Sequence, residues 1–291
     1  MTHALKICEH LARELNNQNG TILKLHSMYG SAVNYKTVDG RLVTFLSSHR
    51  SMGVASICLP TDNIREFFYG TDELHIYNSL LIGKSAKIDF SNSEIISPYI
   101  SSYRNLSKKA DLASQLRKVL ISNIPENGIY KEIAKLKILR LPEFPGVTSG
   151  GKYTDRFGKL MESILYNADF NTLDQNFKDI IGYGIGLTPS ADDFILGILA
   201  VYSSWDRVFK NLAQACKANI YRTNDISAEM LFHGSEKRFC EPIIEFLKSS
   251  DISKATANIR NIGYSSGHDI LCGIYAGLIL LCEVQNKINL R

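Results

Sequence analysis

The chain has 291 residues, of which 45% are hydrophobic and 21% charged, and its formal net charge is +4. This composition excludes an intrinsically disordered chain, a collagen and a coiled-coil array. The charge excess is too small to imply nucleic-acid binding, because no basic run is longer than Lys108-Lys109, but it is compatible with a small anionic substrate. At roughly 100–200 residues per domain, the length favours two domains.

The location of the protein is indicated by its hydrophobic and cysteine patterns. Charged residues interrupt the N-terminal segment, so it lacks the continuous apolar stretch of a secretory signal. The longest apolar run, 270–282, is shorter than the roughly 20 residues that span a bilayer and predicts a buried core helix. The six Cys residues form no CxxC pair, which is typical of reduced thiols and argues against a zinc site. We therefore expect a cytoplasmic protein that binds neither nucleic acid nor membrane.

The N-terminal third predicts one helix and then short strands. The helix covers 2–15, and Asp39-Gly40 predicts a hairpin between two of the strands. A spacing of roughly 8–12 residues between strands is typical of a small sandwich or barrel. The predicted strands are 21–25, 31–35, 42–46, 54–59, 73–77 and 86–90. We expect a β-rich domain over 1–104 with a leading helix.

From residue 105 the apolar residues follow a helical period, so the overall fold class is α+β with a mostly helical domain over 105–291. A segment dense in Pro, Gly, Ser and Thr, 141–154, interrupts the pattern and is either a linker or a functional loop. The predicted helices are 105–121, 127–135, 155–167, 172–180, 190–204, 206–219, 226–232, 237–248, 252–261 and 268–283.

The most informative segment is 182–197, in which three alternating glycines precede a helix start. Thr188 or Ser190 can cap this helix, and Ser190-x-x-Asp193 has the spacing of a capping box. The arrangement recurs 76 positions later, where Ser266-x-x-Asp269-x-x-x-Gly273 matches Ser190-x-x-Asp193-x-x-x-Gly197. If the two helices cross at these glycines, their N-termini open onto one pocket that offers N–H groups and hydroxyls to phosphate or carboxylate.

Capping alone also explains the serines and one acid of each motif, and this alternative stays open. It does not explain Asp192, which stands beside Asp193 when one acid already serves the helix dipole. A second carboxylate is suited to Mg²⁺ or to a substrate NH₂, and the sequence does not separate the two.

Other motif matches are weaker. The segment 146–152 matches most of a phosphate-binding P-loop, but Tyr153 replaces its Ser or Thr and two prolines interrupt the required strand. The Gly-x-Ser-x-Gly match at 263–267 lacks the preceding strand of a hydrolase. For His26 and His268, a hydrogen-bonded role in the fold and a role in catalysis both stay open.

With these motifs, the chain resembles a bacterial family catalogued as a domain of unknown function, whose marker is Gly-Leu-Thr-Pro-Ser-Gly-Asp-Asp. The marker stands here at 186–193 with Ala191 in place of the usual Gly, which puts a close backbone approach of ligand there in doubt. The likeness extends to 25–34, to Thr223-x-x-x-Ser227 and to 263–269. The family includes a subunit of the oxamate carbamoyltransferase of anaerobic allantoin degradation, a purine-catabolism enzyme that interconverts oxalurate plus phosphate with oxamate plus carbamoyl phosphate.

The resulting hypothesis is a subunit of a carbamoyltransferase-type complex with an anion pocket at two helix N-termini. Asp192 and Asp193 would bind the carbamoyl nitrogen or Mg²⁺, and His26 would transfer a proton. The expected substrate-binding residues are Gly184, Gly186, Thr188, Ser190, Ser265, Ser266, Gly267 and Lys152. The expected partners are a small anionic substrate and other subunits.

Two other hypotheses stay open. One is a Mg²⁺-dependent kinase or ligase that uses phosphate or a nucleotide at Asp192 and Asp193. The other is a non-catalytic assembly subunit that binds the same small anion.

Overall fold

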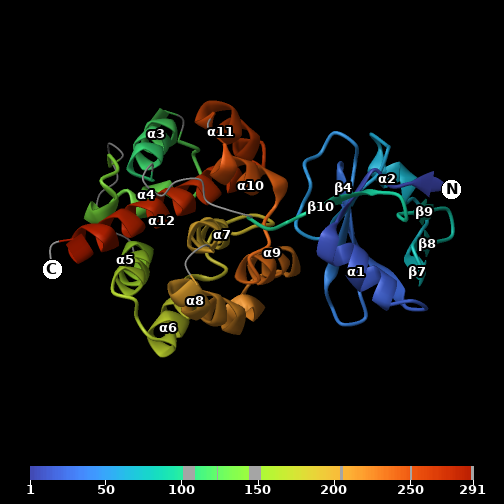
Figure 1. The fold of residues 1–291 in the computed structure, drawn as a ribbon, viewed down its shortest axis with the longest axis horizontal. Helices are drawn as coiled ribbons and strands as arrows, with labels where there is room; N and C mark the ends of the chain where they lie inside the picture. The colour runs from blue at the N-terminus through green and yellow to red at the C-terminus, as the bar shows by residue number, and fades with distance from the viewer. Residues whose placement is uncertain (101–108, 123, 144–151, 204–205, 250, 290–291) are drawn as a thin grey trace. The chain divides into compact units, whose positions relative to one another are not determined.

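The computed structural model describes residues 1–100, 109–122, 124–143, 152–203, 206–249 and 251–289. The chain divides into two compact units, seen in Figure 1: unit 1 is Met1–Tyr99 with Phe239–Glu241, and unit 2 is Ile100–Arg238 with Pro242–Arg291. Unit 1 is rich in strands and unit 2 is helical, which confirms the predicted α+β class. The predicted boundary between residues 104 and 105 lies outside the described residues.

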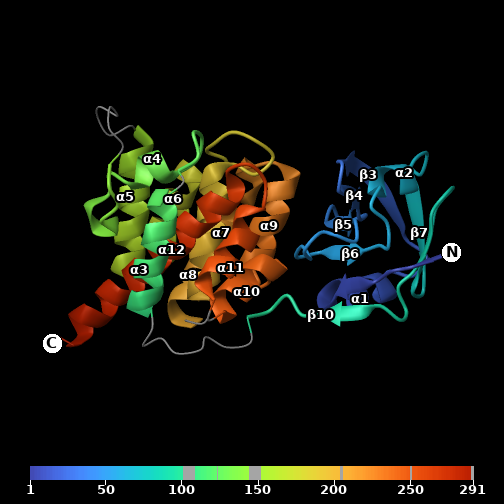
Figure 2. The same cartoon turned by 90° about the horizontal axis from the view of Figure 1, so that it is seen from above.

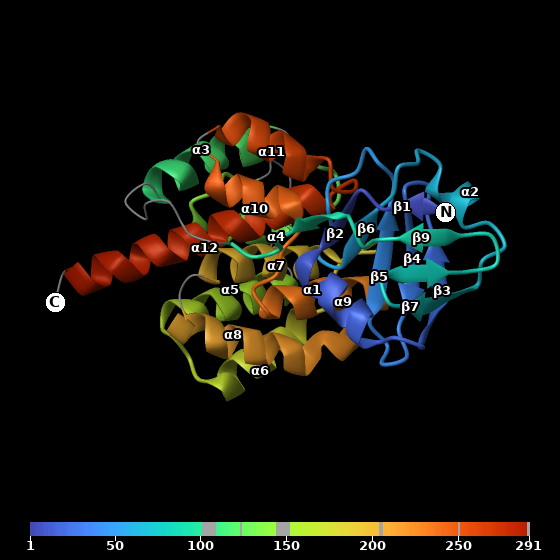
Figure 3. The same ribbon diagram turned by 45° about the vertical axis from the view of Figure 1, so that its right-hand side comes forward.

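Unit 1 contains a ten-stranded sheet with the order β1-β9-β8-β7-β3-β4-β5-β6-β2-β10. Helix α1 (Glu9–Asn17) lies against this sheet, as Figure 3 shows, and buries Leu11 and Leu15. The strands are β1 (Thr2–His3), β2 (Lys6–Cys8), β3 (Ile22–Met28), β4 (Ala32–Lys36), β5 (Leu42–Leu46), β6 (Ser56–Cys58), β7 (Glu73–Tyr77), β8 (Leu80–Ile82), β9 (Lys87–Asp89) and β10 (Glu94–Ile96).

The sheet curls until its two ends adjoin, because neighbouring strands in the chain lie at opposite ends of the strand order. β1 pairs with β9, whereas β2 pairs with β6 and β10. Between them, the Ala4 N–H donates to the Asp89 carbonyl at 2.9 Å and the Leu5 N–H donates to the Cys58 carbonyl at 2.8 Å. Four residues reach at most roughly 14 Å, so the two ends lie together as in a barrel.

The predicted helix over 2–15 is wrong in its first half, because β1 and β2 occupy that stretch and helix α1 begins at Glu9. The apolar residues Ile7 and Cys8 suit either structure. Pairing of β2 with strands on both sides buries these side chains and satisfies backbone hydrogen bonds, and this tertiary pairing overrides the local helical pattern.

The six strands predicted for unit 1 are all present, and β5 and β7 have the predicted bounds. The predicted hairpin joins β4 to β5, where Gly40 adopts a φ of +85°. The short strands β8 and β10 and helix α2 (Ile64–Phe67) were not predicted. The core contains the packed rings of Tyr35, Phe45 and Phe68.

Unit 2 is built around helix α12, which packs on α7 and α3 (Figure 2). Each predicted helix of this unit has a counterpart in the structure. The α-helices are α3 (Lys109–Ser122), α4 (Tyr130–Ile133), α5 (Lys152–Leu165), α6 (Phe170–Ile180), α7 (Ser190–Tyr202), α8 (Asp206–Asn219), α9 (Asp225–Ser235), α10 (Glu241–Lys248), α11 (Ile252–Arg260) and α12 (Ser266–Asn289), with 3₁₀ turns η2 (Lys137–Leu139) and η3 (Ile220–Arg222).

One segment of the described chain, Ser266–Val284 of α12, is long and apolar enough to cross a membrane, with a mean hydropathy of 1.5. In this structure 78% of the segment is buried. The core helix of a globular protein has the same length and composition, and residues 270–282 form the buried helix that the sequence predicts.

The predicted crossing of α7 and α12 at glycines is confirmed. A Cβ added at Gly197 would lie 2.3 Å from the Ile270 carbonyl oxygen, and one at Gly273 would lie 2.0 Å from the Phe194 carbonyl oxygen. At Gly277, the added Cβ would lie 2.9 Å from the Val201 Cβ. Side chains at these positions would separate the helices, so the glycines set how closely the helices approach.

We predict that Gly273→Ala lowers the free energy of unfolding by about 3 kcal/mol, because the new methyl group overlaps backbone atoms of α7. The matched control is Gly158→Ala in α5, where an added Cβ meets its nearest atom, Leu136 Cδ2, at an ordinary 3.5 Å. We expect the control to gain roughly 0.5–1 kcal/mol from helix propensity. Denaturant unfolding measures both, and equal stability of the two variants would contradict a close crossing.

Candidate functional site

The N-termini of α7 and α12 lie together. The Thr188 hydroxyl, just before α7, is 2.6 Å from the Ser266 hydroxyl at the start of α12, and the two share a hydrogen bond. Helices that cross within a few residues of their first turns must have adjacent N-termini, so this contact follows from the glycine crossing. The two repeated sequence motifs therefore form one cluster.

Within the cluster, each motif supplies a hydroxyl to the acid of the other. The Ser190 hydroxyl of α7 lies near the Asp269 carboxylate of α12 and lowers its pKa, and the Ser266 hydroxyl of α12 has the same effect on Asp193 of α7. The predicted capping box is therefore wrong: the residue before α7 is Pro189, and it makes no side-chain cap. The Ser-x-x-Asp spacing instead positions a serine and an acid for exchange between helices.

Asp193 and Asp269 are buried, with 2% and 0% of their surfaces exposed. The Asp269 Oδ1 atom accepts the Ile129 N–H at 2.7 Å. The nearby Thr188 and Ser265 hydroxyls lower the pKa of Asp193 and Asp269 respectively. Burial raises the pKa of Asp269 to about 7. Burial and the neighbouring Asp269 carboxylate raise the pKa of Asp193 well above its usual value.

Asp192 is also buried, but its acceptor oxygens hold the chain in place. Its Oδ1 atom accepts the Gly182 N–H at 2.8 Å, and its Oδ2 atom accepts the hydroxyls of Thr223 at 2.6 Å and Ser227 at 2.7 Å. Burial raises the pKa of Asp192, and these hydrogen bonds oppose the shift. Asp192 therefore joins the glycine loop, the start of α9 and α7, which gives it a fold-stabilising contact set that the sequence did not indicate.

The glycine loop approaches α7 closely. Gly184 adopts a φ of +123°, and a Cβ there would lie 2.4 Å from the Ser190 backbone nitrogen. Gly186 has a φ of +110° and is exposed. The Ala191 N–H, at the position where the family has Gly, donates to the Tyr183 carbonyl at 2.9 Å and so is occupied within the chain.

A cavity of about 220 Å³ lies at the first turn of α12, lined by Pro125, Arg260, Tyr264 and His268. The Arg260 guanidinium donates to the Val119 carbonyl at 2.6 Å and places a positive charge beside the helix N-terminus. His268 Nε2 donates to the Leu120 carbonyl at 3.2 Å, and burial lowers the pKa of His268 to about 4. The cavity therefore combines a neutral imidazole with one fixed cation.

The other predicted site residues lie apart from this cluster or in contacts of the fold. His26 belongs to unit 1, where its Nδ1 atom is 3.0 Å from the Ser27 hydroxyl and it lines a separate cavity of about 360 Å³. Lys152 begins α5, but its side chain and residues 144–151 lie outside the described part of the chain. Gly267 is a packing position, because a Cβ there would lie 2.0 Å from the Ile259 carbonyl oxygen.

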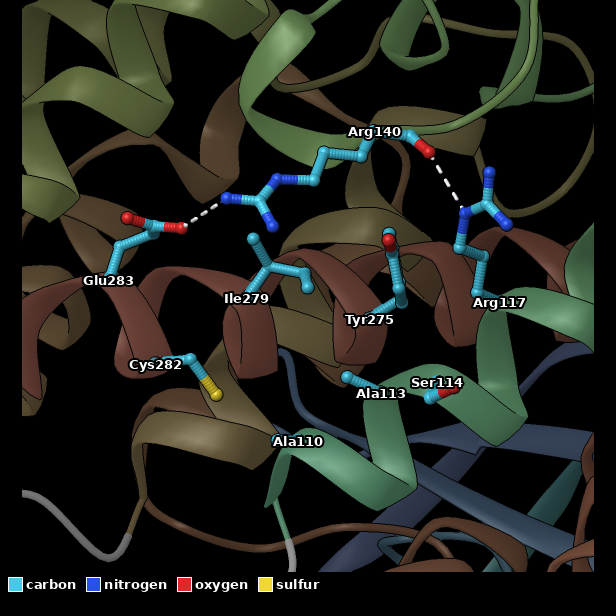
Figure 4. A pocket seen from close by; sticks show the side chains of 9 residues that line it. All are labelled: Ala110, Ala113, Ser114, Arg117, Arg140, Tyr275, Ile279, Cys282 and Glu283. Carbon is cyan, nitrogen blue, oxygen red and sulfur yellow. Dashed lines mark hydrogen bonds and ion pairs between the residues drawn. The ribbon is translucent and has the colours of Figure 1, made fainter. Parts of the chain in front are cut away.

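A further cavity of about 500 Å³ lies between α3 and the second half of α12 (Figure 4). Arg117 donates to the Arg140 carbonyl at 2.9 Å, and Arg140 donates to Glu283 at 3.0 Å. The remaining wall is mostly small or apolar, with Ala113, Ile279 and others. The nearest α12 residue of this cavity, Tyr275, is roughly 14 Å along the helix from Ser266, so the cavity is separate from the N-terminal cluster.

Sequence reasoning missed Arg260 and the backbone N–H of Ile129 as parts of the cluster. No local pattern marks either residue. Gly128, beside Ile129, is the one available signal: a Cβ there would lie 2.7 Å from Asp269 Oδ1, so only glycine lets this backbone reach the acid. Within the described ranges, no group of three or more His, Cys, Asp or Glu side chains has the arrangement of a metal centre.

The comparison with known families bears on this cluster directly. Residues 180–278, 99 of the 291 residues, match the family model described as oxamate carbamoyltransferase subunit AllH. The family is AllH. The match confirms the resemblance inferred from the motifs, and it includes the glycine loop, Thr223-x-x-x-Ser227 and both helix starts. It supports assignment as a subunit of oxamate carbamoyltransferase, which implies other subunits as partners. No solved structure matches the chain.

The AllH segment gives a prediction about Asp192. We expect Ser227→Ala to lower the free energy of unfolding by roughly 1–3 kcal/mol, because it removes a hydrogen bond from a buried carboxylate. The matched control is Ser122→Ala, which removes an exposed hydroxyl that bonds the Val119 carbonyl, and which we expect to change stability little. Chemical denaturation distinguishes the two, and a Ser227→Ala variant as stable as the control would show that Asp192 does not depend on this contact.

Proposed function

We propose that the chain is the subunit of a carbamoyltransferase-type complex that binds the small anionic reactants, oxalurate plus phosphate in one direction and oxamate plus carbamoyl phosphate in the other. The observation that carries the proposal is the joining of two AllH-segment helix N-termini, by Thr188 and Ser266, beside a cavity that contains Arg260. Helix N-termini and a guanidinium both favour anions.

In this proposal, Arg260 and the two hydroxyls bind different parts of the reactants. Arg260 suits a carboxylate or phosphate group, because it lines the cavity and carries a guanidinium with donors beyond the one that bonds Val119. The hydroxyls of Thr188 and Ser266 share one hydrogen bond, and each oxygen keeps a lone pair that is suited to accept an N–H group of a carbamoyl compound. Catalysis would then rest on orientation and on fixed positive charge near the transferring group.

The proposed roles of Asp192 and Asp193 differ from those expected from the sequence. Asp192, expected to hold the carbamoyl nitrogen or Mg²⁺, uses both carboxylate oxygens to join Gly182 to Thr223 and Ser227. Asp193 lies behind the two hydroxyls instead of beside open solvent. In this proposal the acids act on substrate through the hydroxyls, and His26 has no assigned part.

Calorimetric titration with phosphate, oxamate and carbamoyl phosphate tests the proposal. We expect the wild type to bind at least one of these anions, and Arg260→Gln and Ser266→Ala each to weaken binding about tenfold or more through loss of a charge-assisted or hydroxyl contact. Arg65→Gln, which changes an exposed arginine of unit 1, is the matched control and should bind as the wild type does. Binding of none of the anions by the wild type, or unchanged binding by both site variants, would contradict the proposal.

A further inference from the structure

The surroundings of the two buried acids, Asp193 and Asp269, do not balance the negative charges that both would carry if ionised. The Oδ2 atoms of Asp193 and Asp269 are buried and have no hydrogen-bond partner among the described residues. None of the ion pairs formed by the described residues includes either acid. Two adjacent ionised carboxylates in such a place would repel each other and would leave an unsatisfied oxygen on each, which is costly in a protein interior.

The groups around the pair supply hydrogen-bond donors but little compensating charge. α7 contributes Asp192, whose negative charge also raises the pKa of Asp193, and α12 contributes His268 and Cys272 beside Asp269. The segment before α4 contributes the Ile129 N–H, and the end of α11 contributes Arg260, which acts on His268 and Cys272. A bound proton is the smallest cation that removes the repulsion, and it needs no cavity.

We propose that Asp193 and Asp269 form a proton-binding site in which the two carboxyls share one proton, and that the Thr188 and Ser266 hydroxyls connect this proton to the anion site. The two hydroxyls lie near Asp193, whose pKa they lower, and they are 2.6 Å from each other at the half-buried edge of the cluster. Paired carboxylates that cannot both ionise are an established way to hold a proton near neutral pH.

The chemistry of carbamoyl transfer gives this proton a use, and this part of the inference rests on the proposed function. A phosphate oxygen attacks the carbamoyl carbon of oxalurate, the C–N bond breaks, and its electron pair goes to the nitrogen. The nitrogen takes a proton from the acid pair through a hydroxyl and leaves as the amide of oxamate. Hydrogen phosphate loses its proton on forming carbamoyl phosphate, and that proton returns to the pair, so the step balances without another reactant.

The proton has a measurable effect on stability. The folded pair holds a proton that the unfolded chain releases above its usual aspartate pKa of 3.8, so stability is present at low pH and is lost as the pH rises toward about 7. We expect the ratio of unfolding constants, wild type over the double variant Asp193→Asn/Asp269→Asn, to increase about tenfold per pH unit within this window. His268 and Asp192 titrate in both proteins, so their effects cancel to a first approximation.

The outcomes of this experiment separate the alternatives. A ratio of unfolding constants that does not change with pH means that both carboxylates are ionised, and it overturns the proposal. A hundredfold change per pH unit means that each carboxyl keeps its own proton, and it overturns the claim that the two share one. Asp155→Asn, at an exposed acid in the first turn of α5, is the matched control and should reproduce the wild-type pH dependence. If the double variant does not fold, ¹³C-aspartate NMR of the wild type and of each single variant at pH 6 shows whether the pair retains a proton.

The connection through the hydroxyls has its own test in the assembled enzyme. Ser266→Ala should shift the pH profile of kcat for oxalurate phosphorolysis, and Ser266→Thr, which restores a hydroxyl, should return it toward the wild-type profile. Identical profiles in all three enzymes would overturn the connection. If the pair retains one proton while phosphate and oxamate fail to bind, the proton site stands and the proposed function falls. If the anions bind but both acids are ionised at pH 6, the proposed function stands and the proton site falls.

Discussion

The close crossing of α7 and α12 is the constraint on which the site depends. Gly197 and Gly273 allow the two backbones to touch, and the serines and acids one to two turns earlier are therefore held against one another. Ser190 lies near Asp269 and Ser266 lies near Asp193, so each acid has a hydroxyl of the other helix start in its surroundings. The site therefore needs both helices in place, and residues that are far apart in the chain come together only when the helices cross.

Burial and hydrogen bonding give the three acids of the cluster different roles. Asp192 receives three hydrogen bonds from the chain and stabilises the loop before α7. Asp193 and Asp269 have hydroxyls nearby but keep an unpartnered oxygen each, and burial raises the pKa of Asp269 to about 7. Residues of the same type within one family segment therefore divide into one that supports the fold and two suited to holding a proton.

The sequence predicted the parts of this structure that depend on local periodicity and on repeated spacing. The helices of unit 2 and the meeting of the two motifs were expected, because Ser-x-x-Asp-x-x-x-Gly occurs twice with small residues on one face. The same pattern misassigned the acids, since a capping box within one helix and an exchange between two helices have identical sequence spacing. Only the crossing geometry distinguishes them. The strand pairing of residues 2–8 and the approach of Ile129 and Arg260 depend on distant partners, which no local pattern encodes.

The central claim is that the two motifs form one anion site, and a phosphate titration followed by backbone amide NMR of the full chain tests it most directly. We predict that the resonances of Thr188 and Ser266 move together and give the same Kd, because both residues would face one bound anion. Movement at only one of the two motifs, or different Kd values at the two, would contradict the claim.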